Sequence, residues 1–174
     1  MTITRSPIVA DATMRGVHRT FVTGVTIVTT MDEDVPRGLA VNAFSSISLS
    51  PALVMVCVQR TSTTHDPLFR ATHLGINILA ADQLSTAGMF ASKRTDKFAD
   101  ISWQPAAYGS PILPEASAWM EAEICDRLQV DTHTAFVARV VDAAYSDRPA
   151  LLYAGGGFFD GGALQPAHTT TEQE

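Results

Sequence analysis

One stretch of the chain, residues 37–51, constrains the fold more than any other because its two faces differ in character. Read with a period of two, one face is nearly all apolar: Leu39, Val41, Ala43, Ser45, Ile47 and Leu49. The opposite face carries no charge and offers mostly small hydrogen-bonding groups: Ala40, Asn42, Phe44, Ser46, Ser48 and Ser50. A period of two is that of a β-strand. We therefore expect a strand whose polar face either lines a ligand site or is half-exposed to water.

Other segments show strand patterns and are joined mostly by short turns. The β-branched run 25–30 precedes turn-like residues 31–36, and the unbroken apolar run 52–58 suggests a strand buried on both faces. Further strands are expected at 74–79, 117–130, 134–141 and 150–153. The proline-rich segment 101–115 is expected to be an ordered excursion, because it also carries aromatic and apolar residues.

Three helices are expected between these strands. The first has Asp11 as N-cap and places Met14, Val17 and Phe21 on one side, a second begins near residues 66–67, and the third covers 81–91. Six or seven strands with about three inserted helices predict a mainly β fold, an antiparallel barrel decorated by helices.

Length and composition bound the class of protein. The 174 residues suit one domain, which we assign to residues 1–162, with a disordered tail over 163–174. Only 17% of the residues are charged, which favours a homodimer that covers apolar surface, and a net charge of −6 argues against nucleic-acid binding. The chain shows neither a signal peptide nor a membrane span, so we expect a cytoplasmic protein. Cys57 and Cys125 are expected to be small buried hydrophobic residues.

Common catalytic and nucleotide signatures are absent from the sequence. It contains no G-x-G-x-x-G motif, no Walker loop and no H-E-x-x-H, and its five histidines lack metal-ligand spacing. No metal site is therefore expected. Two segments could bind an anion: the hydroxyl-rich run 60–65 before a helix, and a basic cluster of Lys93, Arg94 and Lys97. An ordinary capped turn and a solvated loop are the alternatives.

These residues together resemble the flavin reductase family, the reductase components of two-component flavin-dependent monooxygenases. The similarity runs in order through 21–30, 38–51, 77–80 and 90–98, and covers most of the chain from about residue 15 to 158. It implies a split β-barrel of the antiparallel, Greek-key, FMN-binding type, which forms a homodimer. It also implies reduction of FMN or FAD by hydride transfer from NADH or NADPH to flavin N5, with reduced flavin supplied to a partner monooxygenase.

The resemblance also implies roles for individual residues. The isoalloxazine ring would lie against Ala40, Val41, Asn42 and Ala43, with Ser46 and Ser48 bonding nearby. The phosphate would be held by Gln59, Arg60, Thr61, Ser62 and Thr63, and the other side closed by Phe90 and Lys93. His133 would orient the nicotinamide, although the family's usual Gly-Asp-His is Asp131-Thr132-His133 here.

Two other functions stay open at this point. A flavin-binding electron-carrier module on the same fold would bind FMN tightly and ignore nicotinamides. An oxidase of the related pyridoxamine-phosphate type would need a more basic phosphate site than Arg60 and Lys93 provide. For hydride transfer no acid–base pair is needed, because the cofactors carry the chemistry.

Overall fold

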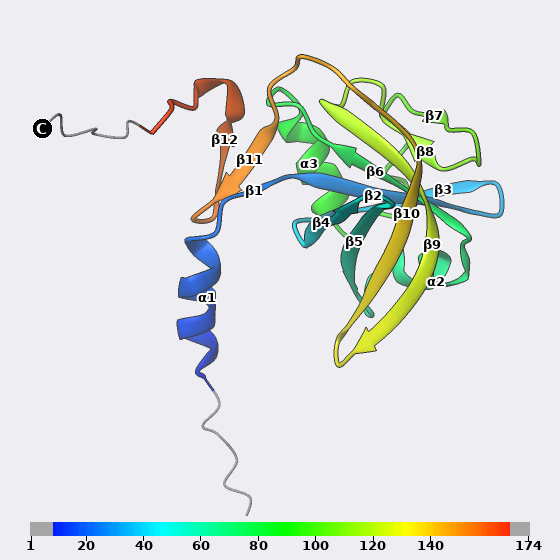
Figure 1. Cartoon of the computed structure of the whole chain (residues 1–174), viewed down its shortest axis with the longest axis horizontal. Coiled ribbons are helices and arrows are strands. Elements are labelled where there is room, and N and C mark those ends of the chain that lie inside the picture. The colour runs from blue at the N-terminus through cyan, green and yellow to red at the C-terminus, as the bar shows by residue number, and fades with distance from the viewer. Residues whose placement is uncertain (1–8, 168–174) are drawn as a thin grey trace, which may run out of the picture.

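A seven-stranded antiparallel sheet forms the body of the protein in the computed structural model, which describes residues 9–167 (Figure 1). Its strands, in spatial order, are β3 (Val35–Val41), β2 (Thr26–Asp32), β6 (His73–Ile78), β9 (Ala118–Val130), β10 (His133–Tyr145), β5 (Ala52–Gln59) and β4 (Phe44–Leu49). Two smaller sheets are made by β1 (Thr23–Gly24), β11 (Leu151–Ala154) and β12 (Gly157–Asp160), and by β7 (Gln104–Pro105) and β8 (Pro111–Ile112). The helices are α1 (Asp11–Arg19), α2 (His65–Arg70) and α3 (Leu84–Ala91).

The predicted fold class is confirmed in its coarse form, mainly β with a few inserted helices. Two clusters of buried apolar side chains pack against the sheet, on opposite faces of β2, since Val28 belongs to one and its neighbour Ile27 to the other. One surrounds Phe136 and Ile76, and the other lies beneath α3 around Ile27 and Phe90. No helix among residues 9–167 is long and apolar enough to cross a membrane. The cytoplasmic location stays a prediction.

The unbroken alternation of residues 37–51 predicted one strand, and this prediction is wrong. Strand β3 ends at Val41 and β4 begins at Phe44, and the two strands lie at opposite ends of the sheet order. The Phe44 backbone N–H donates to the carbonyl of Asn42 at 2.9 Å, a three-residue turn that interrupts the strand. After this turn the apolar face points outward, and Leu49 is 90% exposed.

Two other predictions of burial are wrong. Strand β5 is buried on one face only, because Val54, Val56 and Val58 point inward while the alternate residues are half-buried. Cys125 is exposed. It has no pairing partner in β10, whose register against β9 shifts at this position, so the bulge turns its side chain outward.

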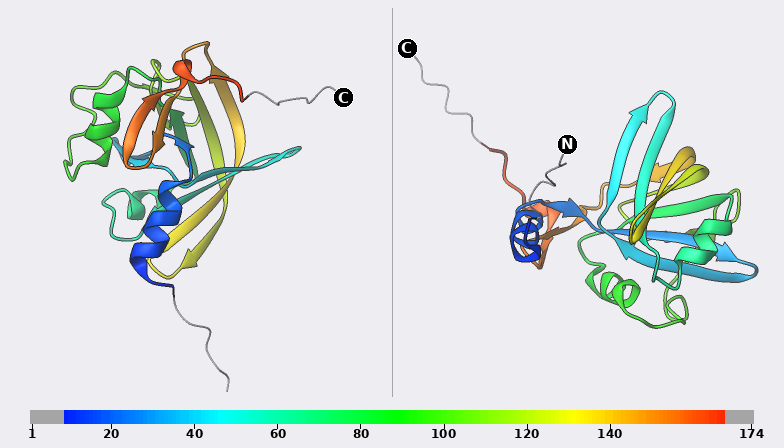
Figure 2. Two further views of the ribbon diagram at one scale, coloured as in Figure 1. Left: turned by 90° about the vertical axis from the view of Figure 1, so that its left-hand side faces the viewer. Right: turned by 90° about the horizontal axis from the view of Figure 1, so that it is seen from below.

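The first helix and the small three-stranded sheet form an arm beside the main sheet (Figures 1 and 2). Helix α1 begins at Asp11, so its cap position is Ala10 rather than Asp11, and no side chain caps it. It ends at Arg19, which leaves Phe21 outside the helix and 72% exposed. Strands β1 and β12 were not predicted, because Thr23–Gly24 has only two residues and Gly157–Asp160 does not alternate between apolar and polar residues. No residue of α1 is buried.

The excursion 101–115 is ordered, as expected, because buried polar side chains fasten it to the sheet. Glu121 of β9 is fully buried and accepts hydrogen bonds from the backbone N–H groups of Tyr108 and Ser110, both at 2.9 Å. Asn77 of β6 accepts one from the Leu113 N–H at 2.8 Å. At the C-terminal side, residues 161–163 form a 3-10 turn, and residues 168–174 of the expected tail lie outside the described part.

Candidate functional site

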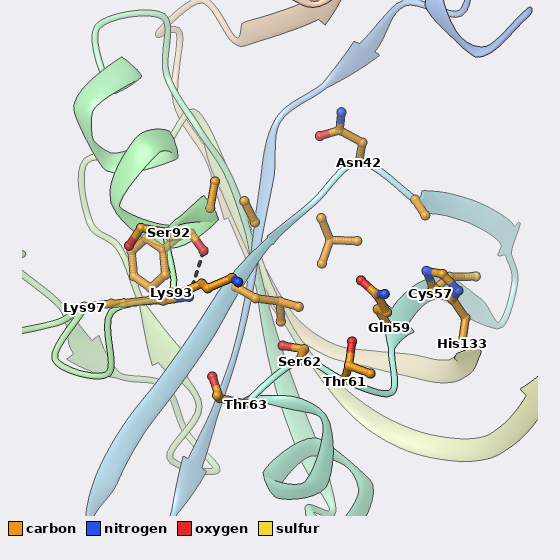
Figure 3. Close-up of a pocket in the computed structure, with 16 residues that line it drawn as sticks. Asn42, Cys57, Gln59, Thr61, Ser62, Thr63, Ser92, Lys93, Lys97 and His133 are labelled. Carbon is orange, nitrogen blue, oxygen red and sulfur yellow. Dashed lines mark hydrogen bonds between the residues drawn. The ribbon is translucent and has the colours of Figure 1, made fainter. Parts of the chain in front are cut away.

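A cavity of about 850 Å³ opens where the chain passes from β3 to β4, between the loop after β5 and the segment after α3. Its volume lies within the range of cofactor and ligand sites. Figure 3 shows Lys93 and Lys97 at one end, Gln59, Cys57 and His133 at the other, and Thr61, Ser62 and Thr63 between them. The lining is Leu39, Ala40, Val41, Asn42, Ala43, Cys57, Gln59, Thr61, Ser62, Thr63, Phe90, Ala91, Ser92, Lys93, Lys97 and His133.

The wall formed by residues 39–43 carries no charged or nucleophilic side chain. Val41 is buried, and its carbonyl accepts a hydrogen bond from the hydroxyl of Thr26. The Ala43 carbonyl accepts one from the Cys57 N–H at 3.0 Å, which ties the turn to β5. Burial raises the pKa of the Cys57 thiol above its usual value, so the thiol stays neutral at physiological pH.

The loop after β5 is held in a fixed shape by its own hydrogen bonds. Ser62 N–H donates to the Gln59 carbonyl at 3.0 Å, and Thr64 N–H donates to the Ser62 hydroxyl at 3.3 Å. The Thr64 hydroxyl donates to the carbonyl of Gly38 at 3.1 Å, which anchors the loop to β3. Within residues 9–167, the backbone N–H groups of Thr61 and Thr63 donate to no protein acceptor. These two groups and the neighbouring hydroxyls can therefore receive an anion.

A buried histidine, which the sequence did not identify as a site residue, connects this loop to β10. The Nε2 atom of His65 lies 2.9 Å from the hydroxyl of Thr134, and Nδ1 lies 3.0 Å from the Asp66 carboxylate. Its ring is stacked on Phe69 at 5.7 Å between centroids. Because Thr134 follows His133 in β10, His65 fixes the loop relative to the end of the cavity that holds His133.

The segment after α3 closes the third side. Phe90 is buried and meets Phe98 edge-on, with 5.0 Å between ring centroids. Lys97 is buried as well and donates to the carbonyls of Phe90 at 2.9 Å and Gly38 at 3.3 Å. Burial lowers the pKa of Lys97 below its usual value. Lys93 is exposed at the rim.

Eleven of the fourteen predicted site residues line this cavity, and three do not. Ser46 and Ser48 lie on β4 beyond the Asn42 turn, outside the lining. Arg60 is turned toward the β9–β10 connection, where its guanidinium donates to the Asp131 carbonyl at 3.4 Å and its N–H to the Thr132 carbonyl at 2.9 Å. The prediction missed five lining residues: Leu39, Cys57, Ala91, Ser92 and Lys97.

The sequence could have identified some of these five lining residues. Cys57 and Gln59 share one face of a strand, so the alternation of β5 places both at the same wall. Lys97 was already in the basic cluster, but only its contacts distinguish it from Lys93 and Arg94.

The chemistry available in the cavity follows from its lining. None of the lining residues is acidic, two are lysines, and His133 is the one imidazole, with its Nδ1 2.9 Å from the Thr132 hydroxyl. The site therefore offers no carboxylate general acid or base. It suits a ligand with a neutral planar part against the backbone wall and an anionic part at the lysine end.

Comparisons with known proteins agree on one family. The family model described as "Flavin reductase like domain" matches residues 17–162. The reductase component of 4-nitrophenol 4-monooxygenase/4-nitrocatechol 2-monooxygenase from Rhodococcus opacus is 40% identical over 145 residues, covering 83% of this chain and 78% of that protein. The reductase component of flavin-dependent trigonelline monooxygenase from Acinetobacter baylyi is 32% identical over 160 residues, covering 91% of this chain. The chain spans only 50% of that relative's length.

A solved structure resembles the whole described fold. The NADH:FAD oxidoreductase SgcE6 of Streptomyces globisporus, in complex with NAD and FAD fragments, superposes with a TM-score of 0.81 at 30% identity. The match covers 97% of this chain and all of the other.

Proposed function

The chain belongs to the flavin reductase family, and from this premise we propose that it reduces FMN or FAD with NADH or NADPH and supplies the reduced flavin to a partner monooxygenase. The observation that carries the proposal is the cavity itself, which combines a neutral backbone wall, a loop with free N–H groups and two lysines. Relatives named as reductase components of monooxygenases support the transfer to a partner enzyme.

The residues of the chain would act by binding and orientation. A bound flavin supplies the redox chemistry, accepting a hydride from the reduced nicotinamide. Residues 40–43 would hold the ring through backbone groups, and Thr61, Ser62 and Thr63 would hold the phosphate through N–H groups and hydroxyls. His133, at the opposite end from the lysines, would orient the nicotinamide (Figure 3). Fixed geometry rather than proton transfer would then set the rate.

A homodimer and a closed split barrel belong to the same proposal. Support for the homodimer comes from apolar surface that a single chain leaves uncovered: Met14, Val17 and Phe21 on or beside α1, and Ile47 and Leu49 on β4 are all exposed. An isolated nine-residue helix is marginal in water, so α1 needs a packing partner. Light scattering coupled to gel filtration tests this point, and a monomeric mass at micromolar concentration would contradict it.

The activity is tested by mixing the purified protein with each nicotinamide and each flavin and following the absorbance of the reduced nicotinamide. We expect consumption of NADH or NADPH that depends on added FMN or FAD. A protein that binds FMN stoichiometrically but oxidises neither nicotinamide would instead be an electron carrier. The absence of any flavin-dependent oxidation would refute the proposed function.

A further inference from the structure

His65 is a buried imidazole that the proposed function does not yet use. It is 6% exposed and lies at the start of α2, directly after the loop that follows β5. Its Nδ1 atom lies 3.0 Å from a carboxylate oxygen of Asp66, and its Nε2 atom lies 2.9 Å from the hydroxyl of Thr134 in β10. Both ring nitrogens therefore have a polar partner, and one of these partners belongs to another element.

The two partners decide which ring nitrogen of His65 carries the proton. An ionised carboxylate can only accept hydrogen bonds, so Nδ1 of the neutral ring carries the proton and donates to Asp66. Nε2 is then the acceptor, and the Thr134 hydroxyl donates to it. Thr134 is fully buried, so bulk water does not reach its side chain. The hydrogen bond therefore joins α2 to β10 directly and in one direction.

The His65 ring has little freedom to move. It stacks on Phe69 with 5.7 Å between ring centroids and an interplanar angle of 28°. The His65 backbone N–H donates to the Ser62 carbonyl of the loop at 3.0 Å. On the other side, Thr134 belongs to β10, which is paired with β5 and with β9. His65 is therefore a rigid link between the loop and β10.

This link joins two parts of the cavity wall that would hold different ligands (Figure 3). On the loop side, Ser62 and Thr63 line the cavity and would hold the flavin phosphate. On the strand side, His133 precedes Thr134. Because side chains alternate along a strand, His133 points to the opposite face from Thr134, where it lines the cavity. The spacing between loop and strand would thus determine how a flavin and a nicotinamide meet.

We propose that His65, oriented by Asp66 and bonded to Thr134, is a positioning residue that sets the spacing between flavin and nicotinamide for hydride transfer. The inference rests on the proposed function and adds to it a residue that touches neither ligand. In that step a C4–H bond of the reduced nicotinamide breaks and an N5–H bond of the flavin forms, so two electrons pass from nicotinamide to flavin. A displacement of about 1 Å can lower such a rate by about a hundredfold.

The test removes the Thr134 hydroxyl while the shape of the side chain is kept. Anaerobic stopped-flow absorbance at saturating reduced nicotinamide measures the rate constant of hydride transfer, and fluorescence titration measures flavin affinity. We expect Thr134→Val to lower the rate constant by about ten- to a hundredfold and to change flavin affinity by less than about threefold, because no group that binds flavin is removed. Thr134→Ser keeps a hydroxyl donor and should restore the rate constant to within about threefold of wild type.

Thr29→Val is the matched control. Thr29 of β2 is also fully buried and its hydroxyl donates to the Pro111 carbonyl at 2.6 Å, but it does not line the cavity. This variant should lose a similar amount of stability and keep the wild-type rate constant. If Thr29→Val slows hydride transfer as much as Thr134→Val does, a general loosening of the fold explains both results and the positioning role is wrong.

A second measurement uses the ligand-free wild-type protein and does not depend on activity. In long-range proton–nitrogen NMR spectra at about pH 8, where an imidazole is normally neutral, the proton of the His65 ring should reside on Nδ1. A proton on Nε2 would overturn the inference even if no Thr134 variant folds.

Failure of the inference and failure of the proposed function give different results. An unchanged rate constant in Thr134→Val, or equal losses of rate constant and flavin affinity, contradicts the role of His65 and leaves the reductase function intact. If wild type oxidises no nicotinamide in the presence of flavin, the proposed function fails and the inference fails with it.

Discussion

Substituting Gly38 by alanine tests how closely α3 is packed against the sheet beside the cavity. A Cβ atom built on Gly38 would lie 2.7 Å from Cε1 and 3.1 Å from Cδ1 of Phe90, and 3.2 Å from Cζ of Phe98. Carbon atoms in good contact are about 3.5–4.0 Å apart. The Phe90 ring would therefore have to move by about 1 Å.

The surroundings of Phe90 leave little room for that movement. The ring is 1% exposed and packs edge-on against Phe98, which itself packs edge-on against Trp103. Overpacking of this kind costs about 1–3 kcal/mol of the free energy of unfolding. At about 2–4 °C per kcal/mol for a domain of this size, we expect Gly38→Ala to lower Tm by roughly 2–12 °C.

The assay is thermal and urea unfolding followed by circular dichroism, with Gly88→Ala as the control. Gly88 lies within α3 and has no neighbouring atom within 4 Å of a built Cβ. Alanine is favoured over glycine in a helix by about 1 kcal/mol, so this variant should be slightly more stable than wild type. If Gly38→Ala were as stable as Gly88→Ala, the close packing of Phe90 against β3 would be wrong.

Four further results are expected. His133→Ala should slow NADH oxidation more than it weakens flavin binding, and equal losses in steady-state rate and affinity would contradict the orienting role. Glu121→Gln should lower the free energy of unfolding in urea by about 2 kcal/mol, because one buried N–H loses its acceptor, whereas Glu123→Gln at the exposed pair with Arg139 should change it by less than about 1 kcal/mol. Because burial lowers the pKa of Lys97, the unfolded chain keeps that proton to higher pH. The free energy of unfolding of wild type minus that of Lys97→Met should therefore rise as the pH approaches 10.5. A fall in this difference would contradict the lowered pKa of Lys97. Removing the residues after Ala163 should leave flavin affinity in titrations unchanged.

Most of the main sheet could be predicted because its strands carry an alternating or β-branched pattern long enough to recognise. The break at Asn42 could not, since the alternation stays in phase across the turn and only the bond from Phe44 N–H to the Asn42 carbonyl reveals it. The outward position of Cys125 depends on a shift of register between β9 and β10, which a single strand's sequence does not encode.

The candidate site was predictable where the family motif and the strand order agree. It was not predictable where tertiary position decides between similar residues. Ser46 and Ser48 continue the polar face of residues 40–42 in sequence, yet β4 carries them to the other end of the sheet order. Lys97 and Lys93 look alike in sequence, but the packing of Phe98 against Phe90 draws Lys97 inward.

The contacts that shape the cavity join residues far apart along the chain. The Gly38 carbonyl receives donors from positions 26 and 59 residues away, and His65 meets Thr134 across 69 residues. No single hairpin can form this cavity before the sheet is complete, and contacts of such separation form slowly in folding. During refolding, flavin binding should thus recover with the slowest phase. A cofactor that binds only this completed state stabilises the entire domain by mass action, not one loop of it.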